Sequence, residues 1–164
     1  MSDPIRTLVI PVKGDEILLG RKKPHRKGAF GVGKWNGFGG KQEPGETIEQ
    51  TAIRECLEES GLKPTKLTKV AELDFTEDYD LYGHIFLAFE WHGEVAETDE
   101  MIPKWFNISE LPYDLMWDDD IFWLPAVLRG KKIKAKFRFA NKLDTDGTNL
   151  NPTQSVTMTM VDHF

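Results

Sequence analysis

The sequence predicts an α/β fold in which helices cover both faces of a mixed β-sheet. Apolar residues alternate with polar ones, or run without interruption, in many short stretches, as expected for strands. Two other stretches carry helix signals: a capping sequence opens one, and a run of aspartates opens the other. The chain has 164 residues, a length typical of one domain. We therefore expect a single domain over residues 1–164 with a layered α/β/α arrangement.

Strands are predicted along the whole chain. In order, these stretches are residues 7–12, 16–19, 35–38, 66–75, 81–91, 104–106, 132–139 and 155–161. The first two are joined by Lys13-Gly14-Asp15, a hairpin turn sequence, and the long central pair is joined by the polar turn 76–80. The third strand is expected to be short, because glycine dominates residues 28–40 and predicts a loop there.

Two helices are predicted by their end signals. The first begins at residues 47–50, which fit a capping box after the loop dipeptide Pro44-Gly45, and ends before Gly61. The second spans residues 119–129 and carries several large apolar side chains. Residues 109–112 predict only a brief turn or helix start.

Composition and charge exclude several classes of protein. The net charge of -6 argues against a binder of nucleic-acid polymers, which needs a basic face. It does not exclude a nucleotide, since metal ions neutralise phosphates. A single cysteine permits no internal disulfide, the N-terminus lacks a signal-peptide layout, and no apolar run approaches the ~20 residues of a membrane span. We expect a cytoplasmic monomer, away from membranes, whose partner is a small-molecule nucleotide.

Three carboxylates crowd one face of the first predicted helix. Glu55, Glu58 and Glu59 stand at positions i, i+3 and i+4, which places their Cβ atoms ~5–6 Å apart. Like charges this close repel one another unless a cation lies between them. Carboxylate oxygens suit Mg²⁺, or Mn²⁺, and both ions pair with substrate phosphates. We predict a divalent-metal site; the alternative is a solvated acidic face held together by Arg54.

The same stretch resembles the Nudix box. Residues 40–62 read GKQEPGETIEQTAIRECLEESGL, with five residues from Gly40 to Glu46 and seven more before Arg54-Glu55. Every fixed position of the box is filled, and Cys56 takes an apolar position, where a buried thiol behaves as a small hydrophobe. The box is typical of enzymes that hydrolyse nucleoside diphosphates linked to another group. The resemblance implies the Nudix fold.

The resemblance also implies roles for the box residues. The implied Mg²⁺ ligands are Gly39 through its carbonyl, Glu55, Glu58, Glu59 and the loop residue Glu100. One of these glutamates would also accept a proton from the attacking water, and sequence leaves open which one. Arg54 is expected to pair with Glu46 or with a metal-binding carboxylate and so to orient the helix. The alternative for Glu100 is an ordinary acidic loop residue.

Similarity extends beyond the box, over about residues 7–139. Residues 35–41, 99–101 and 117–125 resemble the Nudix branch of oxidised purine nucleoside triphosphatases, the MutT-homologue type. This implies conversion of 8-oxo-dGTP or 2-hydroxy-dATP to the monophosphate and pyrophosphate. Two alternatives stay open: a Nudix hydrolase for a dinucleoside polyphosphate, ADP-ribose or a normal nucleotide, and a Nudix module that binds nucleotides without catalysis.

Base recognition is the second role that this branch implies. Trp117 would stack on the purine, while Asn36, Asp119 and Asp120 would read its edge. Two carboxyl groups that share one proton offer a donor and an acceptor, and moving the proton would let one site read oxidised guanine and oxidised adenine. The alternative is that the aspartates provide favourable charge at a helix start. Asp118 departs from the branch pattern and adds a third carboxylate.

Further substrate-binding candidates are weaker as single residues. They are Thr7, Lys22, Phe30, Phe38, Gly39, Gly40, Lys41, Phe75 and Asp118. Phe30 is expected in a pocket, because it lies in a glycine-rich loop, and Trp123 is expected in the core. The basic stretch 21–27 either attracts the triphosphate or is a solvated loop.

Overall fold

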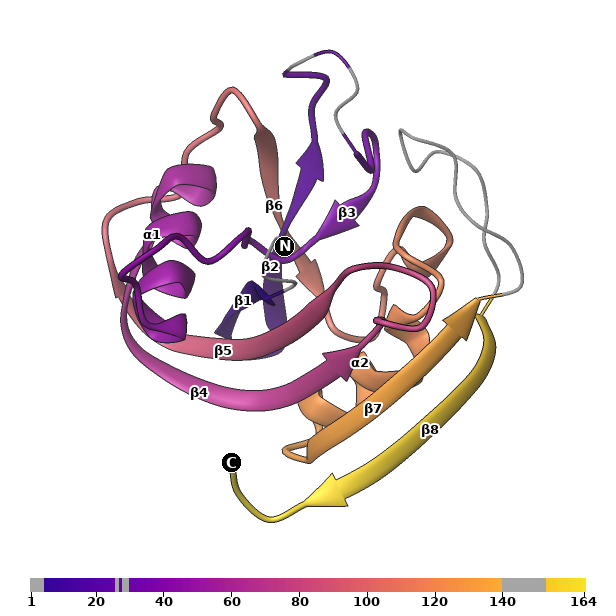
Figure 1. Ribbon diagram of the computed structural model, residues 1–164. Helices are drawn as coiled ribbons and strands as arrows, with labels where there is room; N and C mark the ends of the chain where they lie inside the picture. The colour runs from indigo at the N-terminus through magenta and orange to yellow at the C-terminus, as the bar shows by residue number, and fades with distance from the viewer. Residues whose placement is uncertain (1–4, 26, 28–29, 140–152) are drawn as a thin grey trace.

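A computed structural model describes residues 5–25, 27, 30–139 and 153–164, and it contains one mixed sheet with a helix on each face (Figure 1). The elements are β1 (Ile5–Lys13), β2 (Glu16–Lys22), β3 (Trp35–Asn36), α1 (Ile48–Ser60), β4 (Lys63–Asp74), β5 (Tyr82–His92), β6 (Met101–Asn107), the 3₁₀ helix η1 (Tyr113–Leu115), α2 (Asp120–Leu128), β7 (Lys132–Phe139) and β8 (Thr153–Val161). This arrangement confirms the predicted α/β class.

The sheet mixes parallel and antiparallel pairs. Its strand order is β3-β2-β1-β5-β4-β7-β8, and β6 pairs with β2 off this path. β1 runs parallel to β5, and β4 runs parallel to β7; the other pairs are antiparallel. The parallel β1–β5 pair at the centre joins the first hairpin to the second half of the chain. The central strands are the ones that carry the site described below.

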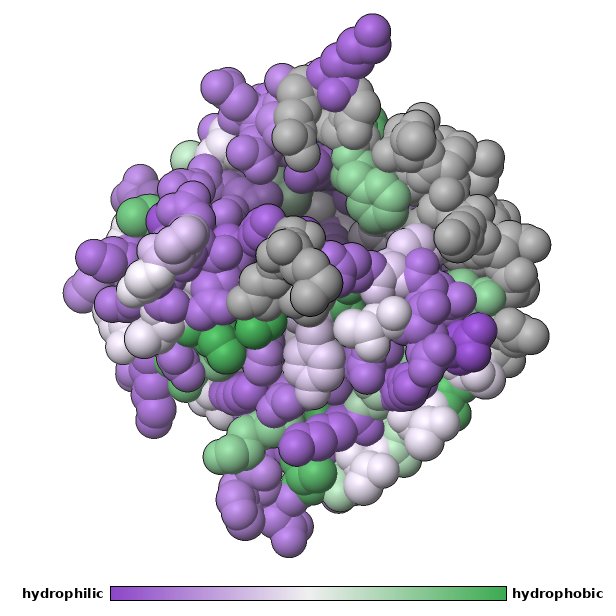
Figure 2. All heavy atoms as spheres, viewed as in Figure 1, coloured by the Kyte–Doolittle hydropathy of each residue, from purple (hydrophilic) through white to green (hydrophobic). Residues whose placement is uncertain are grey.

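The first helix has the predicted ends. The Thr47 side chain accepts from the Gln50 N–H while the Gln50 side chain accepts from the Thr47 N–H, so the capping box is complete. Gly61 follows the helix with φ 84° and donates its N–H to Leu57. Cys56 is fully buried, as predicted from its position in the box. The outward side of α1 is mainly hydrophilic (Figure 2).

Each face of the sheet has its own apolar core. On the α1 side, Val9, Phe38, Cys56 and Phe86 pack together. On the α2 side, Trp123, Leu124 and Val127 pack against Ile133, Phe137 and their neighbours. Among the described helices, none is long and apolar enough to cross a membrane.

Several element boundaries differ from the sequence prediction: β1, β2, β4 and β6 are longer than expected, and three other differences concern β3, residues 109–112 and β8. β3 covers only Trp35–Asn36, because Phe38 leaves β2 and instead exchanges main-chain hydrogen bonds with Val9. Residues 109–112 do not begin a helix; the 3₁₀ turn lies at Tyr113–Leu115, just after Pro112. β8 begins at Thr153, two residues earlier than expected. Of the basic stretch, Arg26 lies outside the described residues.

Candidate active site

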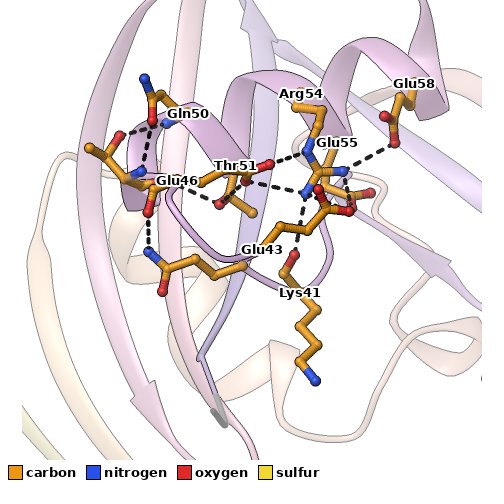
Figure 3. Close-up of polar contacts among 10 residues, drawn as sticks. Lys41, Glu43, Glu46, Gln50, Thr51, Arg54, Glu55 and Glu58 are labelled. Carbon is orange, nitrogen blue, oxygen red and sulfur yellow. Dashed lines mark hydrogen bonds and ion pairs between the residues drawn. The ribbon is translucent and has the colours of Figure 1, made fainter. Parts of the chain in front are cut away.

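Arg54 ties the loop that precedes α1 to the acidic face of the helix (Figure 3). Its Nε lies 2.6 Å from Glu46 Oε1, and its Nη1 lies 2.8 Å from Glu55 Oε1 and 3.4 Å from Glu58 Oε2. Its Nη2 also donates to the Lys41 carbonyl at 3.3 Å. The hydrogen bond from Arg54 lowers the pKa of Glu46. Arg54 therefore pairs with both partners between which the sequence left a choice.

Glu59 is the buried carboxylate of the three. Its side chain accepts from the Gly39 main-chain N–H at 2.7 Å, and the residue is 2% exposed. Burial raises the pKa of Glu59 to about 8; the Gly39 hydrogen bond opposes this rise, and the negative charges of Glu55 and Glu100 add to it. The Lys22 charge lowers it. Glu59 therefore lies near negative charges that the positive charge of Lys22 does not fully compensate.

Glu55 lies against the main chain at Gly40. A Cβ on Gly40 would come within 2.6 Å of the Glu55 carboxyl carbon, so a side chain there would displace the carboxylate. At Gly39, a Cβ would overlap the Thr7 carbonyl oxygen. Burial raises the pKa of Glu55, while the hydrogen bond and charge of Arg54 oppose the rise. Gly39 therefore lets the loop lie against β1, and Gly40 leaves room for the Glu55 carboxylate beside the loop.

A divalent cation fits the chemistry of these groups. All candidate donors are hard oxygen ligands, and the charges of Glu58 and Glu100 raise the pKa of Glu55, so uncompensated negative charge gathers here. In the described part of the chain, no three acidic side chains are yet close enough to form a cation site. The Arg54 guanidinium contacts both Glu55 and Glu58.

A cavity of about 420 Å³ adjoins Glu59. It is lined by segments far apart in sequence: β1, the glycine-rich loop, the β4–β5 turn, β5, the start of α2 and the end of β7. Most predicted substrate residues line it: Thr7, Lys22, Phe30, Asn36, Gly39, Gly40, Phe75, Trp117, Asp118, Asp119 and Asp120.

Two predicted substrate residues do not line this cavity. Phe38 is fully buried on the α1 face of the sheet, among Val9, Ala52 and Cys56. The main chain of Phe38 pairs with that of Val9, so the Phe38 ring points to the same face of the sheet as the Val9 side chain. Lys41 contributes its carbonyl to Arg54 and bridges to β1. The contacts of Phe38 and Lys41 in the structure therefore support the fold.

Asp119 and Asp120 lie buried at the start of α2. Asp119 accepts from the Trp123 indole N–H at 2.9 Å and makes no side-chain capping bond to the helix. Asp120 Oδ2 is buried and lacks a hydrogen-bond partner among the described residues. Burial raises the pKa of both carboxyl groups, and the negative charge of Asp119 adds to the rise at Asp120. These conditions favour one shared proton.

Aromatic rings form the sides of the cavity. Phe30 stacks on Trp117 with ring centroids 5.0 Å apart and planes inclined by 18°. Lys34 Nζ lies 5.0 Å from the centroid of Trp117. Trp123, expected in the core, is 2% exposed and also lines the cavity. Phe30 thus lies beside the predicted base-stacking residue, as expected.

Sequence reasoning missed several lining residues. They include Arg6, Lys34, Tyr79, Asp80 and Phe139. A signal existed for Lys34, since residues two apart on an extended segment share a side, and Asn36 was already a candidate. No local signal marked Tyr79 or Phe139, because tertiary packing alone brings the β4–β5 turn to the end of β7.

Comparison with known proteins adds independent information. A NUDIX domain family model matches residues 3–126. An oxidized purine nucleoside triphosphate hydrolase of Danio rerio is 49% identical over 143 residues, which is 84% of this chain and 88% of that protein. One of Mus musculus is 43% identical over 141 residues, 83% and 86% of the two chains. The crystal structure of a MutT protein from Bacillus halodurans superposes with a TM-score of 0.70 at 23% identity, covering 94% and 96%, which supports the fold.

Proposed function

Because the chain belongs to the NUDIX domain family, we propose that it hydrolyses oxidised purine nucleoside triphosphates, of the 8-oxo-dGTP and 2-hydroxy-dATP type, to the monophosphate and pyrophosphate. Two relatives at 43–49% identity carry this activity in their names. The observation that carries the proposal is the buried Asp119–Asp120 pair, with one unpartnered oxygen, in the same cavity as the buried Glu59.

The acidic end of the cavity would bind the polyphosphate. Mg²⁺, or Mn²⁺, would be held by oxygens chosen from Gly39, Glu55, Glu58, Glu59 and Glu100. When bound, the ion would polarise the phosphoryl group and lower the pKa of its water. Lys22 lines the same region and would attract the phosphates. Arg54 would keep α1 oriented through its contact with Glu46.

The opposite end would bind the base. Trp117 offers a flat ring for stacking, and Asn36 faces the same cavity. The Asn36 amide oxygen accepts from the Gly37 N–H at 2.9 Å, which leaves the NH₂ group as its donor to a base. Asp119 and Asp120, sharing one proton, would supply one donor and one acceptor. An oxidised purine changes the donors and acceptors on its edge, which is the difference that such a pair can read.

The proposed reaction places water attack at the phosphorus next to the nucleoside. One box glutamate, or Glu100, would accept the proton of that water. The products would then be a nucleoside monophosphate and pyrophosphate. The single-domain organisation, monomeric state and cytoplasmic location expected from the sequence remain predictions.

A nucleotide panel tests the proposal. kcat/KM would be measured with Mg²⁺ for 8-oxo-dGTP, 2-hydroxy-dATP, dGTP, dATP, ADP-ribose and a dinucleoside polyphosphate, with products separated by chromatography. We expect at least ~100-fold preference for an oxidised purine over its normal counterpart, since a wrong edge leaves buried polar groups unpaired. Orthophosphate as the first product, or equal kcat/KM for oxidised and normal purines, would overturn the proposal.

A further inference from the structure

Ion pairs join the β4–β5 turn to the end of β7. Glu77 Oε1 lies 2.7 Å from Lys136 Nζ. Asp78 Oδ2 lies 3.2 Å from Arg138 Nε and also accepts from the Phe139 main-chain N–H at 2.9 Å. The Asp78 side chain is 16% exposed, whereas that of Glu77 is 44% exposed. Of the two acidic residues, Asp78 is therefore the one that binds the β7 main chain from a protected position.

The Asp78 carboxylate takes the place of a strand partner. β4 pairs with β7 only as far as Asp74 and Lys136, after which β4 turns away. On the other edge of β7, the register with β8 shifts between Arg138 and Phe139, which is a β-bulge or irregularity. Such irregularities re-aim side chains and are common beside active sites. Asp78 accepts the main-chain N–H at this position, so it stabilises the direction in which Phe139 points.

Phe139 and the turn form one wall of the cavity. The Phe139 ring stacks beside Phe75, with centroids 5.9 Å apart, and meets Tyr79 edge-on at 5.4 Å. All three residues line the cavity. The N–H groups of Asp78 and Tyr79 both donate to the Phe75 carbonyl, at 3.2 and 2.9 Å. The carboxylate that fixes Phe139 is thus part of the same short turn that carries the other two rings.

We propose that Asp78 is a positioning residue for the nucleotide: by holding Phe139 against the β4–β5 turn, it sets the shape of the aromatic wall and hence the affinity for the purine. We assign Asp78 no part in the phosphoryl chemistry, because it is not among the residues that line the cavity and its Oδ2 binds Arg138 and the Phe139 N–H. This inference rests on the proposed function in one respect, namely that the cavity binds a nucleotide base.

The test compares three variants with graded effects. Asp78→Ala removes both contacts to β7. Asp78→Asn keeps an acceptor oxygen for the Phe139 N–H and loses the ion pair with Arg138. Glu77→Gln is the matched control, because it weakens the ion pairs of Glu77 with Lys136 and Arg138, neither of which reaches the β7 main chain. KM and kcat would be measured with 8-oxo-dGTP, and the Kd of 8-oxo-dGMP would be measured by quenching of intrinsic tryptophan fluorescence.

We expect Asp78→Ala to raise KM and Kd about 10-fold, because small displacements of positioning groups weaken productive binding. Asp78→Asn should raise both about 3-fold, and Glu77→Gln should leave both within about 2-fold, since exposed ion pairs contribute little. In all three, kcat should stay within about 2-fold, because the reacting phosphates are untouched. A purely structural role would lower the melting temperature and leave KM and Kd unchanged well below it.

Two outcomes overturn the inference: unchanged KM and Kd in Asp78→Ala, or equal effects of Asp78→Ala and Glu77→Gln. If Asp78→Ala does not fold, an unchanged KM and Kd in Asp78→Asn has the same meaning. Failure of the proposed function can be told apart from failure of this inference, because the nucleotide panel that tests the function uses the parent protein alone. The variants would then be measured with whichever nucleotide the parent hydrolyses best.

Discussion

Replacing Asp120 by Asn perturbs the pair of carboxyl groups that we propose to read the base. Asp120 Oδ2 is buried without a hydrogen-bond partner among the described residues, while Asp119 already accepts from the Trp123 indole at 2.9 Å. An amide has a fixed donor and a fixed acceptor, so Asp120→Asn cannot exchange a proton with its neighbour. We expect kcat/KM for oxidised purine triphosphates to fall by at least ~10-fold.

The magnitude follows from burial. A buried hydrogen bond that is lost or mispaired costs roughly 1–3 kcal/mol, and each ~1.4 kcal/mol is a factor of ten. Stability should respond differently. Asp120 is 3% exposed and burial raises its pKa, so removing its charge does not expose the fold to a new desolvation cost. Asp119→Asn keeps an acceptor oxygen for Trp123. Both variants should therefore melt near the parent.

The assay measures kcat/KM for 8-oxo-dGTP, 2-hydroxy-dATP and dGTP by pyrophosphate release, together with the melting temperature. Asp114→Asn, in the exposed 3₁₀ turn, is the matched control and should change neither quantity. Parental kcat/KM for Asp119→Asn and Asp120→Asn across all three nucleotides would refute the shared-proton reasoning. A large fall in melting temperature in place of a kinetic effect would return the pair to a structural role.

The same pair predicts a pH dependence of stability. The ordinary pKa of an aspartate is 3.8, and burial raises the pKa of Asp119 to about 6 and that of Asp120 in the same direction. Above 3.8 the unfolded chain has released a proton that the folded pair still binds, so the stability contributed by the pair falls as pH rises through the raised values. Melting temperatures between about pH 4 and about pH 8 should show this fall. It should be weaker in the double variant Asp119→Asn/Asp120→Asn.

Two further predictions concern the acidic helix. Glu59→Gln should lower kcat at least ~100-fold by removing a metal oxygen and its charge, while the melting temperature of the metal-free protein stays level or rises, since a desolvated carboxylate is lost. Removal of Mg²⁺ by EDTA should abolish turnover by the parent protein. Near-parental turnover by Glu59→Gln would contradict the metal role of Glu59. Arg54→Gln should lower the urea midpoint of unfolding, because it removes the charged hydrogen bond to Glu46 at 2.6 Å. Urea unfolding measures this, and an unchanged midpoint would show that the Arg54 contact contributes nothing to folding.

Much of the fold follows from local rules. The ends of α1 were predicted because Thr47 and Gly61 satisfy the unpaired groups of a helix by chemistry that neighbouring residues determine. β3 was predicted too long for the opposite reason. Phe38 pairs with Val9, a residue far away in the sequence, and no local pattern reveals which strand an apolar residue will join.

The same contrast between local sequence and tertiary packing applies to the candidate site. Sequence placed Glu55, Glu58 and Glu59 on one helix face, but it treated them as equivalent. The structure separates them, because Glu59 is buried at the Gly39 N–H and Glu58 is more than half exposed. That difference depends on how α1 approaches the β1 backbone, which is a property of the whole sheet.

The Asp119 alternative could have been decided from spacing. Residues four apart on a helix contact each other, and Trp123 is four residues after Asp119. An indole N–H in a core needs an acceptor, so a buried Trp123 predicts that this carboxylate turns inward and away from the helix end.

Neighbouring lysines of the basic stretch, residues 21–27, make different contacts. Lys22 ends β2, lines the cavity and lowers the pKa of Glu59 through its charge. Its neighbour Lys23 instead pairs with Glu97 at 3.0 Å and donates to the Thr98 carbonyl. Adjacent residues on an extended chain point to opposite sides, so only alternate lysines can face a ligand. The two alternatives for the basic stretch therefore apply residue by residue. Lys22 lies where it could attract a triphosphate, which stays a prediction, and Lys23 joins the segment to the loop that carries Glu100.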